Sequence, residues 1–114
     1  MATLYTRRFN LKDSLSDQEI VSHWRWLLGE FAPVVAKVSG VHSVKLYSRH
    51  GALRADLSIA AELDDAAVYE RLLVDAEVRK HLGRFYGAID LKTSEQAFRR
   101  EVTTELINAL SSTG

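Results

Sequence analysis

Charged and phenolic side chains in the middle of the chain have the spacing needed to gather on one face of a β-sheet. Lys45 and Tyr47 precede the dipeptide His50-Gly51, and Arg54 and Asp56 follow it, each pair at every second position. Side chains at every second position of a strand point to the same face. Cationic groups beside a phenol and a carboxylate can bind a phenolic or anionic molecule and stabilise charge that develops on it.

We expect this cluster to form the functional site. Arg54 and Asp56 would orient and polarise a bound molecule, and His50 would act as an acid or base at the rim. The residues expected to contact the molecule are Tyr47, Lys45 and, from the last strand, Arg99. The structural alternative is an ion pair between Lys45 and Asp56 beside a stacked pair of Tyr47 and Arg54, because polar outer faces are common in antiparallel sheets.

No other motif that carries chemistry is visible. The four histidines, at positions 23, 42, 50 and 81, lack the spacing of a known metal site, and the chain has no cysteine. The sequence contains no glycine-rich phosphate loop, dinucleotide fingerprint or nucleophile elbow. We therefore expect neither a metal nor another cofactor.

Length and composition predict a single globular domain. The chain has 114 residues, 46% of them hydrophobic, and its 15 Lys and Arg balance 15 Asp and Glu. Balanced charge argues against nucleic-acid binding, which needs a basic excess or stripe. No apolar run approaches the ~20 residues of a membrane-spanning helix, and the N-terminus lacks the apolar segment of a signal peptide. We expect a cytoplasmic protein with no membrane partner, its domain over residues 1–107 and a tail over 108–114.

A strand over residues 3–11 precedes a helix with a clear start signal. Ser16 and Glu19 have the spacing of a capping box, and apolar residues at helical spacing continue from there towards Gly40, a suitable stop. Pro33 cannot donate a hydrogen bond to the Gly29 carbonyl, so we expect a bend between these two residues. The apolar stripe predicts Trp24 in the core. Trp26 falls nearly opposite, which indicates an interface or a position beneath the tail or a loop.

Residues 41–49 and 53–63 predict a hairpin. With His50 and Gly51 as the two turn residues, Leu46 faces Ala55 on an apolar side and Lys45 faces Asp56 on a polar side. A slip of one residue would mix the two faces, so this register is favoured.

The second half predicts a helical region and a last strand. Asp64 or Asp65 suits the start of the helical region, Asp75 restarts it, and Gly87 suits its end. The last strand is expected over residues 97–106. The order β-α-β-β-α-β is that of the ferredoxin-like fold. We expect an α+β domain with a four-stranded antiparallel sheet, two helical regions on one face, and the polar face uncovered.

Residues 30–41, EFAPVVAKVSGV, resemble the HAPLV…PGV stretch of EthD-type proteins. Those proteins belong to the dimeric α+β barrel superfamily, which also contains small cofactor-free monooxygenases. The resemblance implies a homodimer in which two ferredoxin-like subunits pack sheet against sheet, with their polar faces lining a barrel or cleft. Pro33 and Gly40 match the motif. Phe31 stands where the family has histidine and Ser39 where it has proline, so no histidine role is carried over.

Two functions remain open on this basis. The first is a small homodimeric protein that binds an organic molecule, aromatic or polyketide-like, and acts on it as a cofactor-independent oxygenase. The second is a non-catalytic binding or interaction module that uses the fold only to dimerise. A pocket with convergent, unpaired polar groups favours the first, and a filled interface favours the second.

Overall fold

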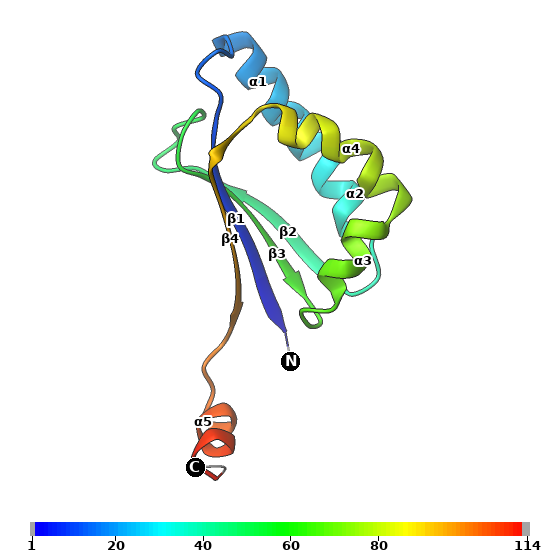
Figure 1. Ribbon diagram of the computed structural model, residues 1–114, viewed down its shortest axis with the longest axis vertical. Helices are drawn as coiled ribbons and strands as arrows, with labels where there is room; N and C mark the ends of the chain where they lie inside the picture. Colours follow the sequence, from blue (N-terminus) through cyan, green and yellow to red (C-terminus); the bar gives the residue numbers. More distant parts are fainter. Residues whose placement is uncertain (1, 113–114) are drawn as a thin grey trace.

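The computed structural model describes residues 2–112. Its elements follow the predicted order β-α-β-β-α-β, with a further helix at the C-terminal end (Figure 1). They are β1 (Thr3–Leu11), α1 (Asp17–Trp26), η1 (Leu27–Phe31), α2 (Ala32–Ala36), β2 (Val41–Tyr47), β3 (Leu57–Leu63), α3 (Val68–Val74), α4 (Ala76–Gly87), β4 (Ile89–Arg100) and α5 (Thr104–Ser112).

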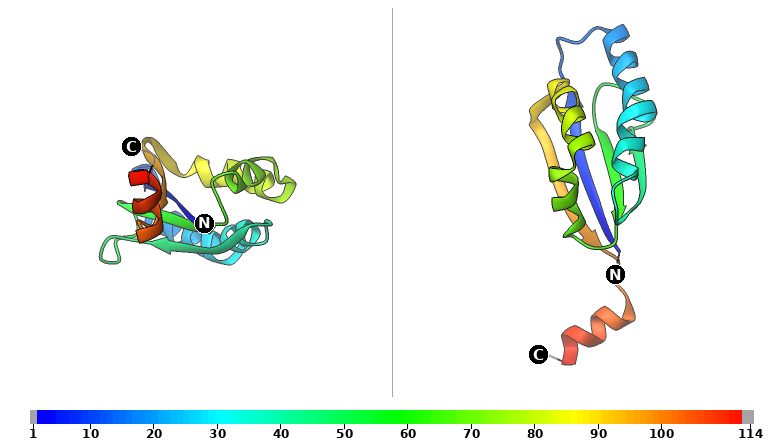
Figure 2. Two further views of the ribbon diagram at one scale, coloured as in Figure 1. Left: turned by 90° about the horizontal axis from the view of Figure 1, so that it is seen from below. Right: turned by 90° about the vertical axis from the view of Figure 1, so that its right-hand side faces the viewer.

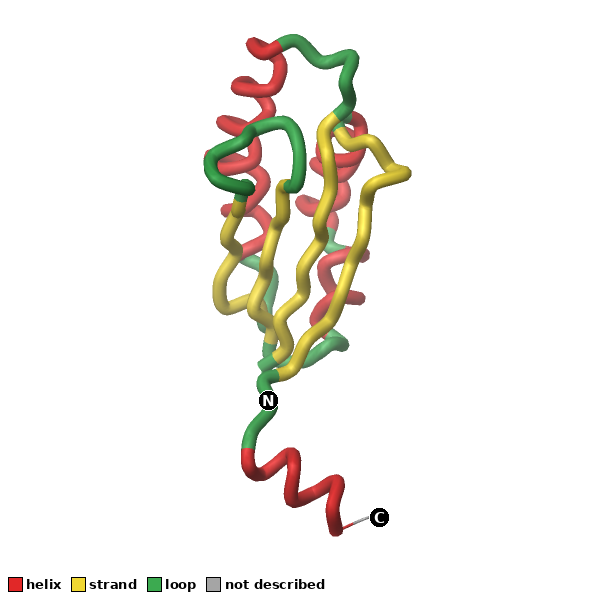
Figure 3. The backbone as a smooth tube through the Cα atoms, turned by 90° about the vertical axis from the view of Figure 1, so that its left-hand side faces the viewer, coloured by secondary structure: helices red, strands yellow, loops and turns green. Residues whose placement is uncertain are grey.

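The four strands form one antiparallel sheet in the order β2-β3-β1-β4. The helices from α1 to α4 lie on one face of this sheet, and the other face is uncovered (Figures 2 and 3). The predicted α+β class and sheet are therefore confirmed. Among residues 2–112, no helix is long and apolar enough to cross a bilayer.

Alternation along the two central strands separates the core from the uncovered face. Phe9 of β1, with Leu57 and Leu63 of β3, is almost completely buried under the helices. The neighbouring Arg8 points to the opposite face and is exposed. Because side chains alternate along a strand, one apolar layer and one polar layer follow directly from the sequence.

The predicted register of the hairpin is wrong, although its faces are right. Leu46 pairs with Ile59 instead of Ala55, a displacement of four residues, and Lys45 pairs with Ala60 instead of Asp56. An even displacement leaves the side chains of the paired strands, residues 41–47 and 57–63, on their predicted faces. The polar and apolar sides therefore survive, but the expected cross-strand contacts of Lys45 with Asp56 and of Tyr47 with Arg54 do not form.

A loop over residues 48–56 causes this displacement. Its tip is the predicted tight turn, since His50 and Gly51 both have positive φ and the Ala52 N–H donates to the Arg49 carbonyl at 2.9 Å. The rest of the loop bonds to other elements instead of extending the hairpin. The Arg54 carbonyl accepts a hydrogen bond from the Leu11 N–H at 2.8 Å, at the end of β1.

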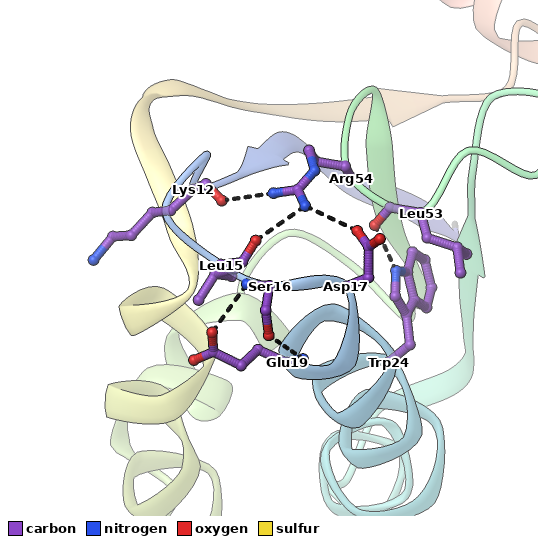
Figure 4. A network of polar contacts seen from close by, with 8 residues as sticks. All are labelled: Lys12, Leu15, Ser16, Asp17, Glu19, Trp24, Leu53 and Arg54. Carbon is purple, nitrogen blue, oxygen red and sulfur yellow. Dashed lines mark hydrogen bonds and ion pairs between the residues drawn. The ribbon is translucent and has the colours of Figure 1, made fainter.

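The side chain of Arg54 fixes the loop to the start of α1 (Figure 4). Its guanidinium donates to the Lys12 carbonyl at 3.2 Å and to the Leu15 carbonyl at 3.0 Å, and it pairs with Asp17 at 3.3 Å. The Trp24 indole N–H donates to the Leu53 carbonyl at 2.8 Å from the same side. These bonds satisfy the Lys12 and Leu15 carbonyls between β1 and α1 and the Leu53 carbonyl of the loop.

The start of α1 agrees with the prediction, and a π-helix lies next to Pro33, where a bend was expected. Ser16 and Glu19 form the expected capping box. The π-helix η1 ends at Phe31, two residues before Pro33, and the Ala32 N–H that follows it donates to the Leu27 carbonyl five residues earlier. Pro33 has no N–H to offer the Gly29 carbonyl, so a widened turn at this point is the expected response.

The two tryptophans exchange their predicted places. Trp26 is buried, whereas Trp24 is only partly buried beneath the loop that holds Leu53. Trp26 stacks on Phe31 at 5.3 Å and on His23 at 5.4 Å between ring centres. The buried side of α1 is rotated by about one residue from the prediction because His23, a polar type, lies at its centre.

The C-terminal region also departs from the prediction. The last strand, β4, begins at Ile89 and ends at Arg100, and residues from Thr104 onwards form α5, across the expected boundary at 107/108. Apolar residues at every fourth position, Phe98, Val102 and Leu106, fit a helix as well as a strand. The Thr103 hydroxyl accepts the Leu106 N–H at 3.1 Å and starts the helix. The last two residues of the expected tail lie outside the described residues.

Replacing Arg54 tests its structural role. Arg54→Ala removes hydrogen bonds to two carbonyls, and we expect the free energy of unfolding to fall by about 1–3 kcal/mol. Urea denaturation followed by circular dichroism at neutral pH measures the change. Arg49→Ala is the matched control: it removes only an exposed ion pair with Asp56 at 3.6 Å, and the expected loss is below about 1 kcal/mol. Equal losses in the two variants would contradict the structural role.

The buried His23 predicts a loss of stability in acid. Burial, with a smaller contribution from nearby Arg84, lowers the pKa of His23 to about 4. The unfolded chain binds the proton at higher pH than the folded chain, so stability falls as pH drops from about 6.5 towards 4. At pH ~4.5 the free energy of unfolding is lower by about 2 kcal/mol because of His23. His23→Phe should remove that part of the loss, as measured by denaturation at neutral pH and at pH ~4.5. An equal loss of stability between neutral pH and pH ~4.5 in the parent and in His23→Phe would contradict this role of His23.

Candidate functional site

The predicted site residues do not come together. Lys45 and Tyr47 lie exposed on the uncovered face of β2, and Arg99 lies on the same face of β4, where it donates to the Thr6 hydroxyl at 2.8 Å. Arg54 is turned away to the start of α1, as described above. The uncovered face of a single chain therefore holds no convergent cluster of these groups.

The other two predicted residues lie in the 48–56 loop. Asp56 forms ion pairs with Arg8 at 3.7 Å and Arg49 at 3.6 Å, and its backbone N–H donates to the Asn10 side chain at 2.8 Å. His50 is exposed at the turn. The loop conformation accounts for the contacts of Asp56 and for the exposed position of His50. Neither residue pairs with Lys45 or Tyr47 in the sheet register.

A cavity lies on the opposite side of the sheet, beneath the helices. Its volume is about 60 Å³, and its walls are almost entirely apolar or aromatic. Strands β1 and β3 supply the floor, and η1, α2, α3 and α4 supply the other walls. The lining residues are Tyr5, Arg7, Phe31, Val35, Ile59, Ala61, Tyr69, Leu72, Leu73, Val78, Leu82, Phe85 and Tyr86.

Arg7 is the only charged residue among those that line this cavity. It shares the inward-facing side of β1 with Tyr5 and Phe9, so strand alternation alone carries its side chain into the apolar layer. Opposite it, Gln96 is its register partner on β4. The guanidinium also lies over the Tyr86 ring, with 5.4 Å between its central carbon and the ring centre.

Neutral acceptors hold the Arg7 guanidinium. Its Nε–H donates to the Tyr5 hydroxyl at 3.0 Å, and its two terminal nitrogens donate to Ser94 and Gln96, each at 2.7 Å. No carboxylate among residues 2–112 forms an ion pair with it. A half-buried positive charge next to an apolar cavity therefore has no counter-ion within the described part of the chain.

The phenol of Tyr5 remains protonated in this setting. Burial raises the pKa of Tyr5 well above its ordinary value, and the adjacent Arg7 opposes the rise only in part. The Tyr5 hydroxyl donates to Gln96 Oε1 at 3.3 Å, and the Tyr69 hydroxyl donates to the same oxygen at 3.3 Å. Both phenols are thus hydrogen-bond donors to Gln96 here.

Three aromatic rings stand beside this polar cluster. Tyr5 lies 4.7 Å from Tyr69 and 5.1 Å from Phe98, and Tyr69 lies 5.2 Å from Phe98, between ring centres. Tilted rings at these separations form a surface against which another planar ring can pack. The site thus offers aromatic contacts and, at one end, a cation.

The sequence contained a signal for this site in residues 3–11. Tyr5, Phe9 and Leu11 share one parity of the strand, and Arg7 falls between them on the same parity. An arginine on the apolar side of a strand is unusual unless it is paired or functional. The predicted cluster used the polar side of the hairpin, and for that reason Arg7 was not among its residues.

Comparison with known proteins shows the fold. No family model and no curated protein sequence matches this chain. A solved structure of SnoaB, a cofactor-independent oxygenase from Streptomyces nogalater, matches with a TM-score of 0.69 and 16% identity over 90% of this chain and 95% of that one.

Two further solved structures extend this likeness. A dimeric protein of unknown function and ferredoxin-like fold from Bacteroides fragilis has a TM-score of 0.71 and 11% identity over 88% of this chain and 96% of that one. An EthD family protein from Bacillus halodurans has a TM-score of 0.59 and 16% identity over 90% and 100%. Together with the sheet order, these matches show that the chain has the ferredoxin-like α+β fold found in dimeric proteins of this kind.

Proposed function

We propose that this protein is a homodimer that binds a small ionisable aromatic molecule, as its anion, in the cavity beneath the helices, and that it oxygenates that molecule without a cofactor. The observation that carries the proposal is Arg7: a cation at the end of an aromatic cavity with only neutral groups around it. The oxygenase activity is supported by the likeness to SnoaB, which is itself a cofactor-independent oxygenase.

Electrostatics favours an anionic ligand at this position. Charges interact more strongly in a partly buried, low-dielectric site than in water. An anionic oxygen beside the Arg7 guanidinium would supply the missing counter-ion, and the same interaction lowers the pKa of a bound phenol or enol. Since burial keeps the Tyr5 phenol protonated, the ligand's own acidity, increased by Arg7, accounts for its ionisation.

The cavity limits the size of the ligand. At about 60 Å³ it is far smaller than the roughly 300–1,000 Å³ typical of pockets for drug-sized molecules. An aromatic ring enters only if part of the helical wall moves. Leu73 of α3 is 46% exposed, and the chain is extended at Asp75, between α3 and α4. Leu73 therefore loses little packing if this part of the wall shifts.

The proposed reaction needs only the substrate and dioxygen. An acidic CH₂ group of the ring loses a proton and becomes a carbanion. Its negative charge is shared with an oxygen attached to the ring, and this oxygen lies beside Arg7. This anion gives one electron to O₂, the two radicals combine in a C–O bond, and protonation yields a hydroperoxide. Loss of water leaves a carbonyl, so CH₂ and O₂ become C=O and H₂O. Dioxygen is the oxidant, and no external electron donor is required.

The homodimer is supported by the uncovered sheet face. Lys45, Tyr47 and Arg99 lie on this face, which no helix of the same chain covers. The structures of similar fold from Bacteroides fragilis and Thermobifida fusca are described as dimeric. In the proposed dimer these three residues belong to the interface between subunits, while each subunit keeps its own cavity on the far side of the sheet.

Binding of 4-nitrophenol tests the anion site, because its phenolate absorbs visible light and it ionises near neutral pH. We expect the protein to shift the bound phenol towards phenolate. Arg7→Met should weaken phenolate binding by about tenfold to a hundredfold, the size expected for a charge-assisted hydrogen bond. Gln96→Glu should weaken it similarly, because the new carboxylate supplies a counter-ion to Arg7. Spectrophotometric titration measures both.

The control for this test removes one positive charge elsewhere. Arg25→Met changes an exposed arginine of α1 and should leave phenolate affinity within about twofold of the parent. If Gln96→Glu bound phenolate as tightly as the parent protein, Arg7 would not be the anion's partner.

Oxygen uptake tests the reaction. With 2-tetralone, whose ring CH₂ is acidic, we expect uptake of one O₂ per carbonyl formed, in the presence of a metal chelator and without added cofactor. An oxygen electrode and mass spectrometry of the product after reaction under ¹⁸O₂ give the stoichiometry. Arg7→Met should slow the reaction by at least about tenfold. Binding of 2-tetralone without uptake of oxygen would contradict the proposed oxygenase activity and favour the non-catalytic binding module.

A further inference from the structure

One oxygen atom of Gln96 receives hydrogen bonds from three donors. A terminal nitrogen of Arg7 donates to Gln96 Oε1 at 2.7 Å. The hydroxyls of Tyr5 and Tyr69 donate to the same atom, each at 3.3 Å, which is longer than the roughly 2.5–3.0 Å usual between two oxygens. A carbonyl oxygen has two lone pairs, so it cannot serve three donors equally well. The cluster therefore holds a phenol that a further acceptor would satisfy better.

Tyr69 is the freer of the two phenols. The Tyr5 hydroxyl also accepts the Arg7 Nε–H at 3.0 Å, and Tyr5 is only 9% exposed. Any movement of Tyr5 therefore loosens Arg7 itself. Tyr69 is less deeply buried and belongs to α3, part of the wall that the proposed ligand displaces. Its hydroxyl can turn to a new acceptor while Tyr5 and Gln96 continue to hold Arg7.

We propose that Tyr69 is the second hydrogen-bond donor, beside Arg7, to the anionic oxygen of the ligand. This inference rests on the anion site proposed above and adds a residue that determines its specificity. Both side chains line the cavity, and both already donate to one oxygen atom, that of Gln96. Two donors that bond one oxygen lie close enough together to bond another. The anion thereby supplies both the missing counter-ion and the missing acceptor.

The excess of donors selects the chemical class of the ligand. A phenolate or enolate oxygen accepts hydrogen bonds and donates none. The hydroxyl of a neutral phenol brings one more donor to a cluster that is already short of acceptors. Hydrogen bonding therefore favours the ionised form of the ligand in addition to the charge of Arg7.

The ratio of phenolate affinity to phenol affinity tests this role, and Tyr69→Phe is the variant. The ring keeps its packing on Tyr5 and Phe98, and only the hydroxyl is lost. The visible absorbance of 4-nitrophenol against pH, free and bound to the full-length protein, gives the ratio. We expect Tyr69→Phe to lower it by about tenfold, the size of one hydrogen bond to a charged group. A general loss of cavity shape would weaken both forms alike and leave the ratio unchanged.

Ser22→Ala is the control for this measurement. It removes an exposed hydroxyl from α1 and should leave the ratio within about twofold of the parent. Circular dichroism checks that each variant keeps the fold.

The same substitution in a Gln96→Leu background separates direct contact from positioning of Arg7. A hydroxyl that acted only through Gln96 would contribute nothing once Gln96 is replaced. A direct bond to the ligand predicts that Tyr69→Phe lowers the ratio by about tenfold in this background too.

The outcomes separate this inference from the proposed function. A parent protein that does not favour phenolate over phenol overturns the anion site, and the role of Tyr69 with it. A preference for phenolate that depends on Arg7 but is unchanged in Tyr69→Phe overturns the role of Tyr69 alone. An effect of Tyr69→Phe that disappears in the Gln96→Leu background overturns the direct bond to the ligand.

Discussion

The charge of Arg7 in the apolar layer, which no carboxylate of residues 2–112 pairs, is the constraint on which the candidate site depends. Strand alternation on β1 carries this side chain to the helix-covered face, where burial makes a cation costly. Tyr5, Ser94 and Gln96 offset part of that cost through hydrogen bonds, yet none of them bears a negative charge. The electrostatic energy of the site therefore becomes more favourable when an anion binds beside Arg7.

The period of two in the strands explains how much of the fold the sequence could predict. It separated the apolar side of β2 and β3 from the polar side correctly, although the register was displaced by four residues. An even displacement conserves faces but exchanges partners. For this reason the layers, the sheet and the uncovered face followed from the sequence, whereas the expected contact of Lys45 with Asp56 did not.

The errors arose where tertiary contacts override a local pattern. The 48–56 loop leaves the hairpin because Arg54 and the Leu53 carbonyl find partners at the start of α1 and on Trp24. Trp26 is buried in contact with the rings of His23 and Phe31. His23 is a polar type at the centre of the buried side of α1, so a pattern based on hydrophobicity does not detect that side. The cavity depends on packing between elements, which no single strand or helix encodes.

The two faces of the sheet thus serve different requirements. The helix-covered face encloses Arg7 and the aromatic cavity, where we propose that the ligand binds. The uncovered face carries Lys45, Tyr47 and Arg99, which belong to the interface of the homodimer that we propose. The predicted cluster of charged residues does not converge on the open sheet of a single chain, and its role as a site stays a prediction. One charged residue on the apolar side of a strand was the more informative signal, because burial makes its presence costly unless it serves a purpose.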